Sequence, residues 1–123
     1  MFIIFINFTN HPSAKWSLNQ LENAEIYGDI TDIPFPEVSP DGDENYILQL
    51  SNQYIAEILK YNPDAVLCQG EMTLAFRVAN LLIHKGIIVL AACSKRIVTE
   101  KIGVNGETIK NAEFNFTRFR KYE

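Results

Sequence analysis

Three short polar segments carry the side chains of this 123-residue chain that could do chemistry. Their members are amides, hydroxyls, a histidine, a glutamate and two bases, which together suit a phosphate or a nucleotide better than a metal ion. They are Asn10, His11, Ser13 and Trp16 in the first segment, Gln69, Gly70, Glu71 and Thr73 in the second, and Ser94, Lys95 and Arg96 in the third. No cluster has metal-ligand spacing, and there is no glycine-rich dinucleotide fingerprint, Walker loop or nucleophile elbow. We therefore expect no metal and no cofactor.

The first segment allows two interpretations for each of its polar residues. Asn10 and Ser13, with Thr9, either cap the following helix or hold a phosphate at its N-terminus. His11 precedes a proline in a loop and is a candidate ligand contact or proton carrier. Trp16 either packs in the core or stacks on a base.

The other two segments are equally open. Glu71 in a first helical turn either offsets the helix dipole or serves as a base or ribose contact. Gln69 pairs with a base edge or hydroxyl, or with its own loop, and Gly70 is explained by backbone conformation. Ser94-Lys95-Arg96 is either a solvated turn or a positive site beside a phosphate.

An alternating pattern of strands and helices must position these segments. Apolar runs predict strands, helical spacing predicts amphipathic helices between them, and Pro and Asp mark a long loop at 31–43. The expected strands are Phe2–Phe8, Ile26–Ile30, Ala65–Cys68 and Ile87–Ala92, and the expected helices are Trp16–Asn23, Glu44–Tyr61 and Glu71–Lys85. This order predicts an α/β fold: one Rossmann-like, doubly wound, mostly parallel sheet in strand order 2-1-3-4. Ligands of such sheets bind beyond the strands' carboxyl ends, where all three polar segments lie.

The end of the chain predicts an antiparallel hairpin. Residues 96–103 and 108–119 flank Asn105-Gly106, a strong two-residue turn signal. That turn places Ile102 opposite Ile109 and Lys101 opposite Lys110. Phe114, Phe116 and Phe119 break strict alternation, which predicts a bulge or a twist.

Composition bounds the class of protein. With 47% hydrophobic residues, residues 1–123 suit a single domain, and the net charge of −4 without a broad basic face argues against bulk DNA or RNA binding. No apolar run reaches the roughly 20 residues that span a bilayer, and the apolar start lacks a basic leader, so we expect no membrane association and a cytoplasmic location. Cys68 and Cys93 read as small core residues.

Three motifs together resemble one protein family. They are Asn7-Phe8-Thr9-Asn10-His11-Pro12-Ser13-x-x-Trp16, Asp64-Ala65-Val66-Leu67-Cys68-Gln69-Gly70-Glu71-Met72-Thr73 and Val89-Leu90-Ala91-Ala92-Cys93-Ser94-x-Arg96. They resemble small CRISPR-associated proteins of type III systems, the Rossmann-like relatives of CARF domains that include stand-alone ring nucleases. The resemblance extends from Met1 to about Val98.

The resemblance implies a homodimer that binds cyclic oligoadenylate, most often cyclic tetra-adenylate, and cleaves it without a metal by attack of a ribose 2′-hydroxyl on its own phosphate. The polar segments suit that reaction, with catalytic roles for His11 in proton transfer and for Ser94 and Arg96 at the phosphate. Ligand binding would fall to the remaining residues named above: Asn10, Ser13, Trp16, Gln69, Gly70, Glu71, Thr73 and Lys95. Two alternatives stay open. One is a sensor or sink that holds the ring uncut, and the other is a nucleoside deoxyribosyltransferase-like enzyme with Glu71 as nucleophile.

Overall fold

A five-stranded mixed sheet forms the centre of the computed structural model, which describes residues 3–123. Its strands are β1 (Ile4–Phe8), β2 (Asp29–Asp32), β3 (Ala65–Cys68), β4 (Ile88–Ile102) and β5 (Thr108–Lys121). They lie in the order β2-β1-β3-β4-β5; the first four are parallel, and β5 runs antiparallel to β4. The predicted order of the parallel strands, with a hairpin at one edge, is confirmed.

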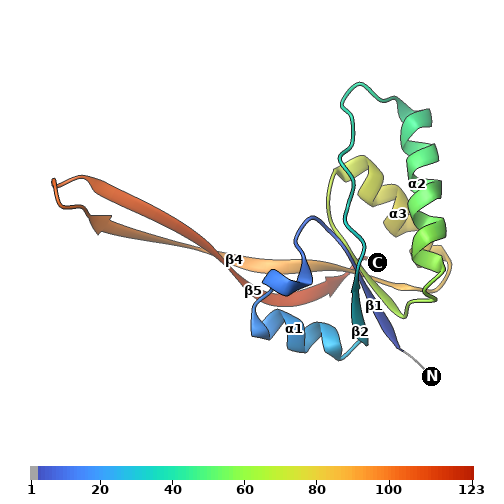
Figure 1. Ribbon diagram of the computed structural model, residues 1–123, viewed down its shortest axis with the longest axis horizontal. Helices are drawn as coiled ribbons and strands as arrows, with labels where there is room; N and C mark the ends of the chain where they lie inside the picture. Colours follow the sequence, from blue (N-terminus) through green and yellow to red (C-terminus); the bar gives the residue numbers. More distant parts are fainter. Residues whose placement is uncertain (1–2) are drawn as a thin grey trace.

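Helices cover both faces of this sheet (Figure 1). α1 (Leu18–Glu25) lies on the face where Phe5, Leu67 and Phe119 are buried. α2 (Glu44–Leu59) and α3 (Met72–His84) lie on the other face, over Ile6 and Val66. Alternating residues of β1 and β3 therefore enter two separate cores, which explains why both strands read as unbroken apolar runs. Among residues 3–123, no helix combines the length and apolar character needed to cross a membrane.

Local signals set most helix boundaries. Ser17 caps α1 by accepting a hydrogen bond from the Gln20 amide. Asp43 caps α2 in the same way through the Tyr46 amide. Beyond α3 the chain turns at Gly86, where φ is +82°, as a left-handed helix stop demands.

The first helix and the second strand begin later than predicted. The segment 13–15 is a short 3₁₀ turn, so the helix expected from Trp16 starts at Leu18. The strand expected at Ile26–Ile30 is β2, Asp29–Asp32, because Ile26 still belongs to the end of α1 and Gly28 forms the turn with φ of +141°. Phe2, the expected start of the first strand, lies outside the described residues.

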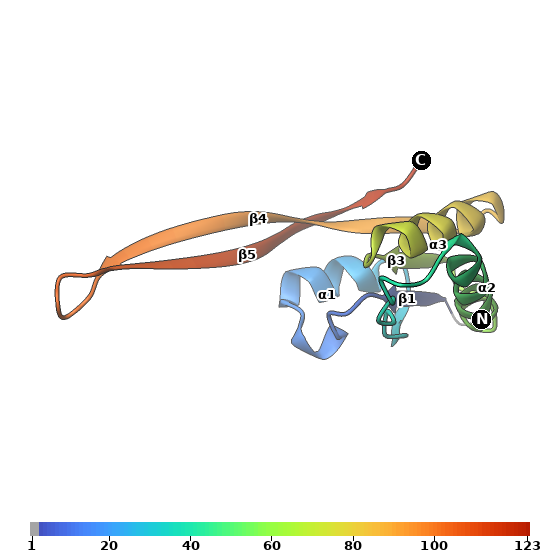
Figure 2. The same cartoon turned by 90° about the horizontal axis from the view of Figure 1, so that it is seen from above.

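The largest correction concerns the fourth strand. β4 continues without interruption from Ile88 to Ile102, so the loop expected at 93–96 does not exist. The strand continues because β5 pairs with it along almost its whole length, from Leu90 opposite Lys121 to Ile102 opposite Thr108. The hairpin therefore projects as a long two-stranded ribbon far beyond the helices (Figure 2).

The hairpin register differs by one residue from the prediction. Gly103 donates to the Glu107 carbonyl, and Gly106 has φ of +80°, so the turn has three residues with a left-handed glycine and not the expected two-residue Asn-Gly turn. Ile102 consequently pairs with Thr108, and Lys101 pairs with Ile109. Lys110 lies opposite Glu100, with its Nζ 3.6 Å from the carboxylate, so the expected like-charge pair is avoided.

A bulge in β5 explains the spacing of the three phenylalanines, as predicted. Ser94 pairs with Phe116 and Cys93 with Arg118, which leaves Thr117 as the additional residue. The insertion keeps Phe119 on the same face as Phe116, and their ring centroids lie 4.8 Å apart. Phe119 is thereby buried against Phe5 at 5.5 Å.

Candidate functional site

A cavity of about 1030 Å³ lies at the carboxyl ends of β1 and β3. Its walls come from the loop after β1, the start of α1, the end of β3 and the base of the β4–β5 hairpin. The residues that line it are Thr9, Asn10, His11, Lys15, Trp16, Ser17, Asn19, Gln20, Leu67, Gln69, Gly70, Ala92, Ser94, Phe114, Asn115 and Phe116. The fold thus brings Asn10, His11, Trp16, Gln69, Gly70 and Ser94 together, whereas the other five predicted site residues do not line the cavity.

A hydrogen-bond network around Asn7 fixes the loop after β1. Asn7 is buried in a central strand, and its amide donates to the His11 carbonyl at 2.9 Å and to Asp32 Oδ1 at 3.0 Å. Thr9 Oγ1 donates to the Asn7 side-chain oxygen at 2.8 Å. The backbone amide and the hydroxyl of Ser13 both donate to Asp32 Oδ2 at 3.1 Å. The Ser13 hydroxyl is therefore engaged in holding the loop.

The same network holds the backbone of His11, which lines the cavity. Besides Asn7, the indole Nε1 of Trp16 donates to the His11 carbonyl at 2.9 Å, and the His11 amide donates to Thr9 Oγ1 at 3.1 Å. His11 itself is exposed. A side chain on so well anchored a backbone is positioned to contact a ligand without reorganising the loop.

Of the two roles expected for Trp16, packing in the core and stacking on a base, the structure shows packing. Its side chain is 6% exposed, and its ring meets Phe5 edge to face at a centroid distance of 6.2 Å. With so little of its ring exposed, Trp16 lacks the free face that a stacked base needs.

Gln69 and Gly70 are set by their contacts after β3. The Gln69 side-chain oxygen accepts from the Ala92 amide at 3.0 Å, extending the β3–β4 pairing by one side chain. That leaves the Gln69 amide nitrogen, which makes no hydrogen bond to residues 3–123, as a donor at the cavity. A Cβ at Gly70 would run into the ring of Phe35, so only glycine fits there.

Glu71 and Thr73 belong to the start of α3 and not to this cavity. The Glu71 carboxylate accepts from the amides of Thr73 at 3.0 Å and Leu74 at 2.8 Å, and from the Thr73 hydroxyl. Hydrogen bonds from the Leu74 amide, then from the Thr73 side chain and amide, lower the pKa of Glu71. The carboxylate thus acts as the N-cap of α3, in agreement with the expectation that Glu71 stabilises a helix N-terminus.

The third polar segment is divided by strand geometry. Ser94 lines the cavity, Lys95 points to the opposite face of β4, and Arg96 returns to the first face one step further along the ribbon, opposite Phe114. The three residues were predicted to converge in a loop. They cannot do so in a strand, because successive side chains alternate between faces.

The cavity lining contains no carboxylate, although the chain holds 15 acidic residues. Its ionisable members are Lys15 and His11, and most of the remaining polar groups are amides and hydroxyls. Sequence reasoning missed Lys15, Asn19 and Asn115, and only Lys15, a base beside the predicted loop, gave a usable signal. No group of three or more potential metal ligands exists among residues 3–123.

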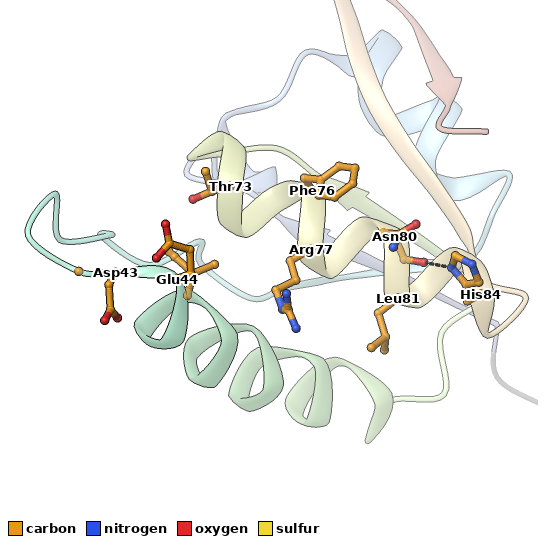
Figure 3. A pocket seen from close by; sticks show the side chains of 10 residues that line it. Asp43, Glu44, Thr73, Phe76, Arg77, Asn80, Leu81 and His84 are labelled. Carbon is orange, nitrogen blue, oxygen red and sulfur yellow. Dashed lines mark hydrogen bonds between the residues drawn. The ribbon is translucent and has the colours of Figure 1, made fainter.

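A second cavity, of about 650 Å³, lies between α2 and α3 (Figure 3). Glu44 at the start of α2 and Arg77 of α3 project into the space between the two helices, and Asp43, Thr73 and Phe76 also line the cavity. At its far end His84 Nδ1 lies 2.7 Å from the Asn80 carbonyl. Its mixed charges and its place on the helical layer make it a weaker candidate than the cavity at the strand ends.

Comparison with known families gives one match. The model described as "Uncharacterized protein MJ1673 family" matches residues 3–120, nearly the whole chain. Comparison with the curated proteins finds no match.

Proposed function

The chain belongs to the MJ1673 family, described as uncharacterized, and from the geometry of its own cavity we propose that it binds a cyclic oligoadenylate at the carboxyl ends of β1 and β3. One observation carries the proposal. None of the residues that line the cavity of about 1030 Å³ is an Asp or Glu, although the chain is acidic, and Lys15 and His11 are among them. Such a lining favours an anion over a cation or a neutral apolar ligand.

The chemistry of the lining suits both parts of a nucleotide. Lys15 and the hydroxyls of Ser17 and Ser94 are donors for phosphate oxygens, and the N-terminus of α1 adds its partial positive charge. The side-chain amides of Asn10 and Asn115 can pair with the donor and acceptor edge of adenine, and the Gln69 amide nitrogen can donate to it. A volume of about 1030 Å³ exceeds what one mononucleotide fills and suits part of a larger ring.

We extend the proposal to cleavage of the ring, with His11 as the proton carrier. A ribose 2′-oxygen attacks the adjacent phosphorus and gives its proton to His11, the bond from phosphorus to the 5′-oxygen breaks, and the leaving 5′-oxygen takes up a proton from water. Protonated His11 then returns its proton to the hydroxide that remains. The products are a 2′,3′-cyclic phosphate and a free 5′-hydroxyl, so atoms and charge balance. Lys15 and Ser94 stabilise the charge on the phosphate. Arg96, on the same strand face as Ser94, extends the positive rim.

Three further properties belong to the same proposal. The strand order with helices on both faces supports a Rossmann-like classification. The resemblance to small type III CRISPR-associated proteins supports a homodimer. It also supports a cytoplasmic location, where such a messenger would be made and removed.

Binding is tested by calorimetry with cyclic tri-, tetra- and hexa-adenylate and AMP. We expect one ring to bind at micromolar or lower Kd, and Lys15→Ala to weaken it about tenfold, or about 1.4 kcal/mol. Lys85→Ala, an exposed lysine beyond α3, is the matched control and should bind like the wild type. Absence of binding for every ring contradicts the proposal.

Cleavage is tested separately by incubating protein and ring with EDTA and analysing the products. His11→Ala should slow cleavage far more than it weakens binding. Binding of an intact ring by the wild type after long incubation would establish the non-cleaving sensor or sink instead. Nothing in the geometry favours the deoxyribosyltransferase alternative, because Glu71 does not line the cavity and its carboxylate caps α3.

A further inference from the structure

The outer part of the β4–β5 hairpin stands alone. β3 pairs with β4 only as far as Leu67 opposite Leu90, so residues 94–116, here called the arm, form a two-stranded ribbon with no third strand among residues 3–123. Both views show the arm extending past the helices (Figures 1 and 2). An isolated two-stranded ribbon is at best marginally stable in water, so the arm needs a surface to lie against.

The two faces of the arm differ in character. One face, continuous with the cavity wall, carries Val98, Ile102 and Phe114, and Phe114 is 70% exposed. The charged residues on this face are Arg96, opposite Phe114, and the pair Glu100 and Lys110, which compensate each other. The other face carries two lysines, a glutamate and several amides or hydroxyls around Ile97 and Ile109. The face with Phe114, here called the apolar face, is therefore the one that gains most from being covered.

The surface area of the chain indicates how much is uncovered. A globular monomer of 14.0 kDa exposes about 6,700 Å², whereas this chain exposes 8412 Å². The excess of about 1,700 Å² exceeds the roughly 800 Å² that each partner buries in a standard interface and lies in the range of obligate dimers.

Charge indicates which partner covers it. The arm carries four basic and three acidic side chains, a net charge of +1, and residues 1–87 carry four and eleven, a net charge of −7. A second copy offers this acidic body to an arm of opposite net charge, and a two-fold axis makes this contact twice. α1 shows the complementary surface beside the arm base: exposed Leu18 and Ile26 flank Glu22 and Glu25, and the helix has no basic residue.

We propose that the arm is the dimerisation element, with its apolar face seated on a second copy of this chain and directed toward that copy's α1. The inference gives a surface to the proposed homodimer and does not depend on its ligand. Phe114 and Phe116 lie both on this face of the arm and in the cavity wall. A second copy on this face therefore covers the mouth of the cavity.

The test compares neighbouring residues on opposite faces. Val98 and Ile97 are 48% and 42% exposed, so lysine at either position adds the same charge without removing a core contact. In sedimentation without nucleotide, the wild type should be a dimer at micromolar concentration, Val98→Lys should raise the dimer Kd at least about tenfold, and Ile97→Lys should leave it within a factor of about three. Circular dichroism confirms that both variants are folded.

Three results overturn the proposal: a monomeric wild type at 200 µM, a dimer unaffected by Val98→Lys, or equal weakening by both substitutions. Hydrogen exchange of the wild type provides a test free of folding defects. Arm amides at 98–101 should exchange more slowly as protein concentration rises across the dimer Kd, and rates independent of concentration contradict the proposal. Because no nucleotide is present, failure here is distinct from failure of ring binding.

Discussion

Asn7→Ala should be among the most destabilising polar substitutions in this protein. Asn7 is 1% exposed, and its side chain makes three hydrogen bonds, to the His11 carbonyl, Asp32 and Thr9. At a net 0.5–1.5 kcal/mol each, their loss costs about 2–4 kcal/mol. In the variant the His11 carbonyl still accepts a hydrogen bond from Trp16, and the exposed Asp32 can bond to water. The former partners of Asn7 therefore add little to the loss of stability.

Urea unfolding and thermal melting measure this loss. At roughly 4 °C for each kcal/mol in a domain of this size, Tm should fall by about 8–15 °C. Asn10→Ala is the matched control, since Asn10 is exposed in the same loop and should change stability by less than about 0.5 kcal/mol. A loss below about 1 kcal/mol for Asn7→Ala, or equal losses for both variants, would refute the claim that this network anchors the loop.

Three other predictions follow from the packing and the caps. Phe119→Ala should cost about 3–5 kcal/mol in urea unfolding, whereas deleting Thr117 should cost less, because without the additional residue Phe116 and Phe119 lie two positions apart and stay on the same face; a deletion as costly as Phe119→Ala would contradict the described register. Because the folded-state pKa of Glu71 is lowered, its stabilisation is complete above the unfolded-state pKa and is lost as pH falls through the folded one, so wild type and Glu71→Ala should differ by about 1 kcal/mol at neutral pH and converge in acid; a gap that is constant with pH would exclude the capping role. Burial raises the pKa of Cys68 to about 12, so at pH 8 a thiol reagent should modify half-buried Cys93 first and Cys68 only on unfolding, and equal rates would contradict the described burial.

The parallel part of the fold could be predicted from sequence because its signals are local. The run before Asn7 and the segment Ala65–Cys68 are apolar at every position, which only strands buried on both faces require. The helix ends are set equally locally, because the cap at Ser17 and the turn at Gly86 depend on a few neighbouring residues.

The hairpin could be predicted only in part. Asn105-Gly106 marked the turn, but whether the loop has two or three residues depends on the Gly103–Glu107 bond, and one residue of shift changes every cross-strand pair. Nothing near Cys93–Arg96 shows that these residues continue as a strand, because their partner, Phe114–Arg118, lies some 20 residues away.

The candidate site could also be predicted only in part. His11 and Gln69 end up at one cavity because both follow adjacent parallel strands, a consequence of topology that the sequence conveys. Glu71 and Lys95 were assigned by type and proximity, and the structure directs one to its own helix and the other to the opposite face of β4. Asn7, which anchors the loop, was read as the end of an apolar strand, since its partner Asp32 is 25 residues away.

Chemical-shift mapping of ¹⁵N-labelled protein during titration with cyclic tetra-adenylate tests most directly where a nucleotide binds. The account predicts the largest amide shifts at Asn10, His11, Lys15, Gln69 and Ser94, with residues of the α2–α3 cavity such as Phe76 and Asn80 unmoved. Shifts centred on Phe76 and Asn80, or none at millimolar ligand, would contradict it.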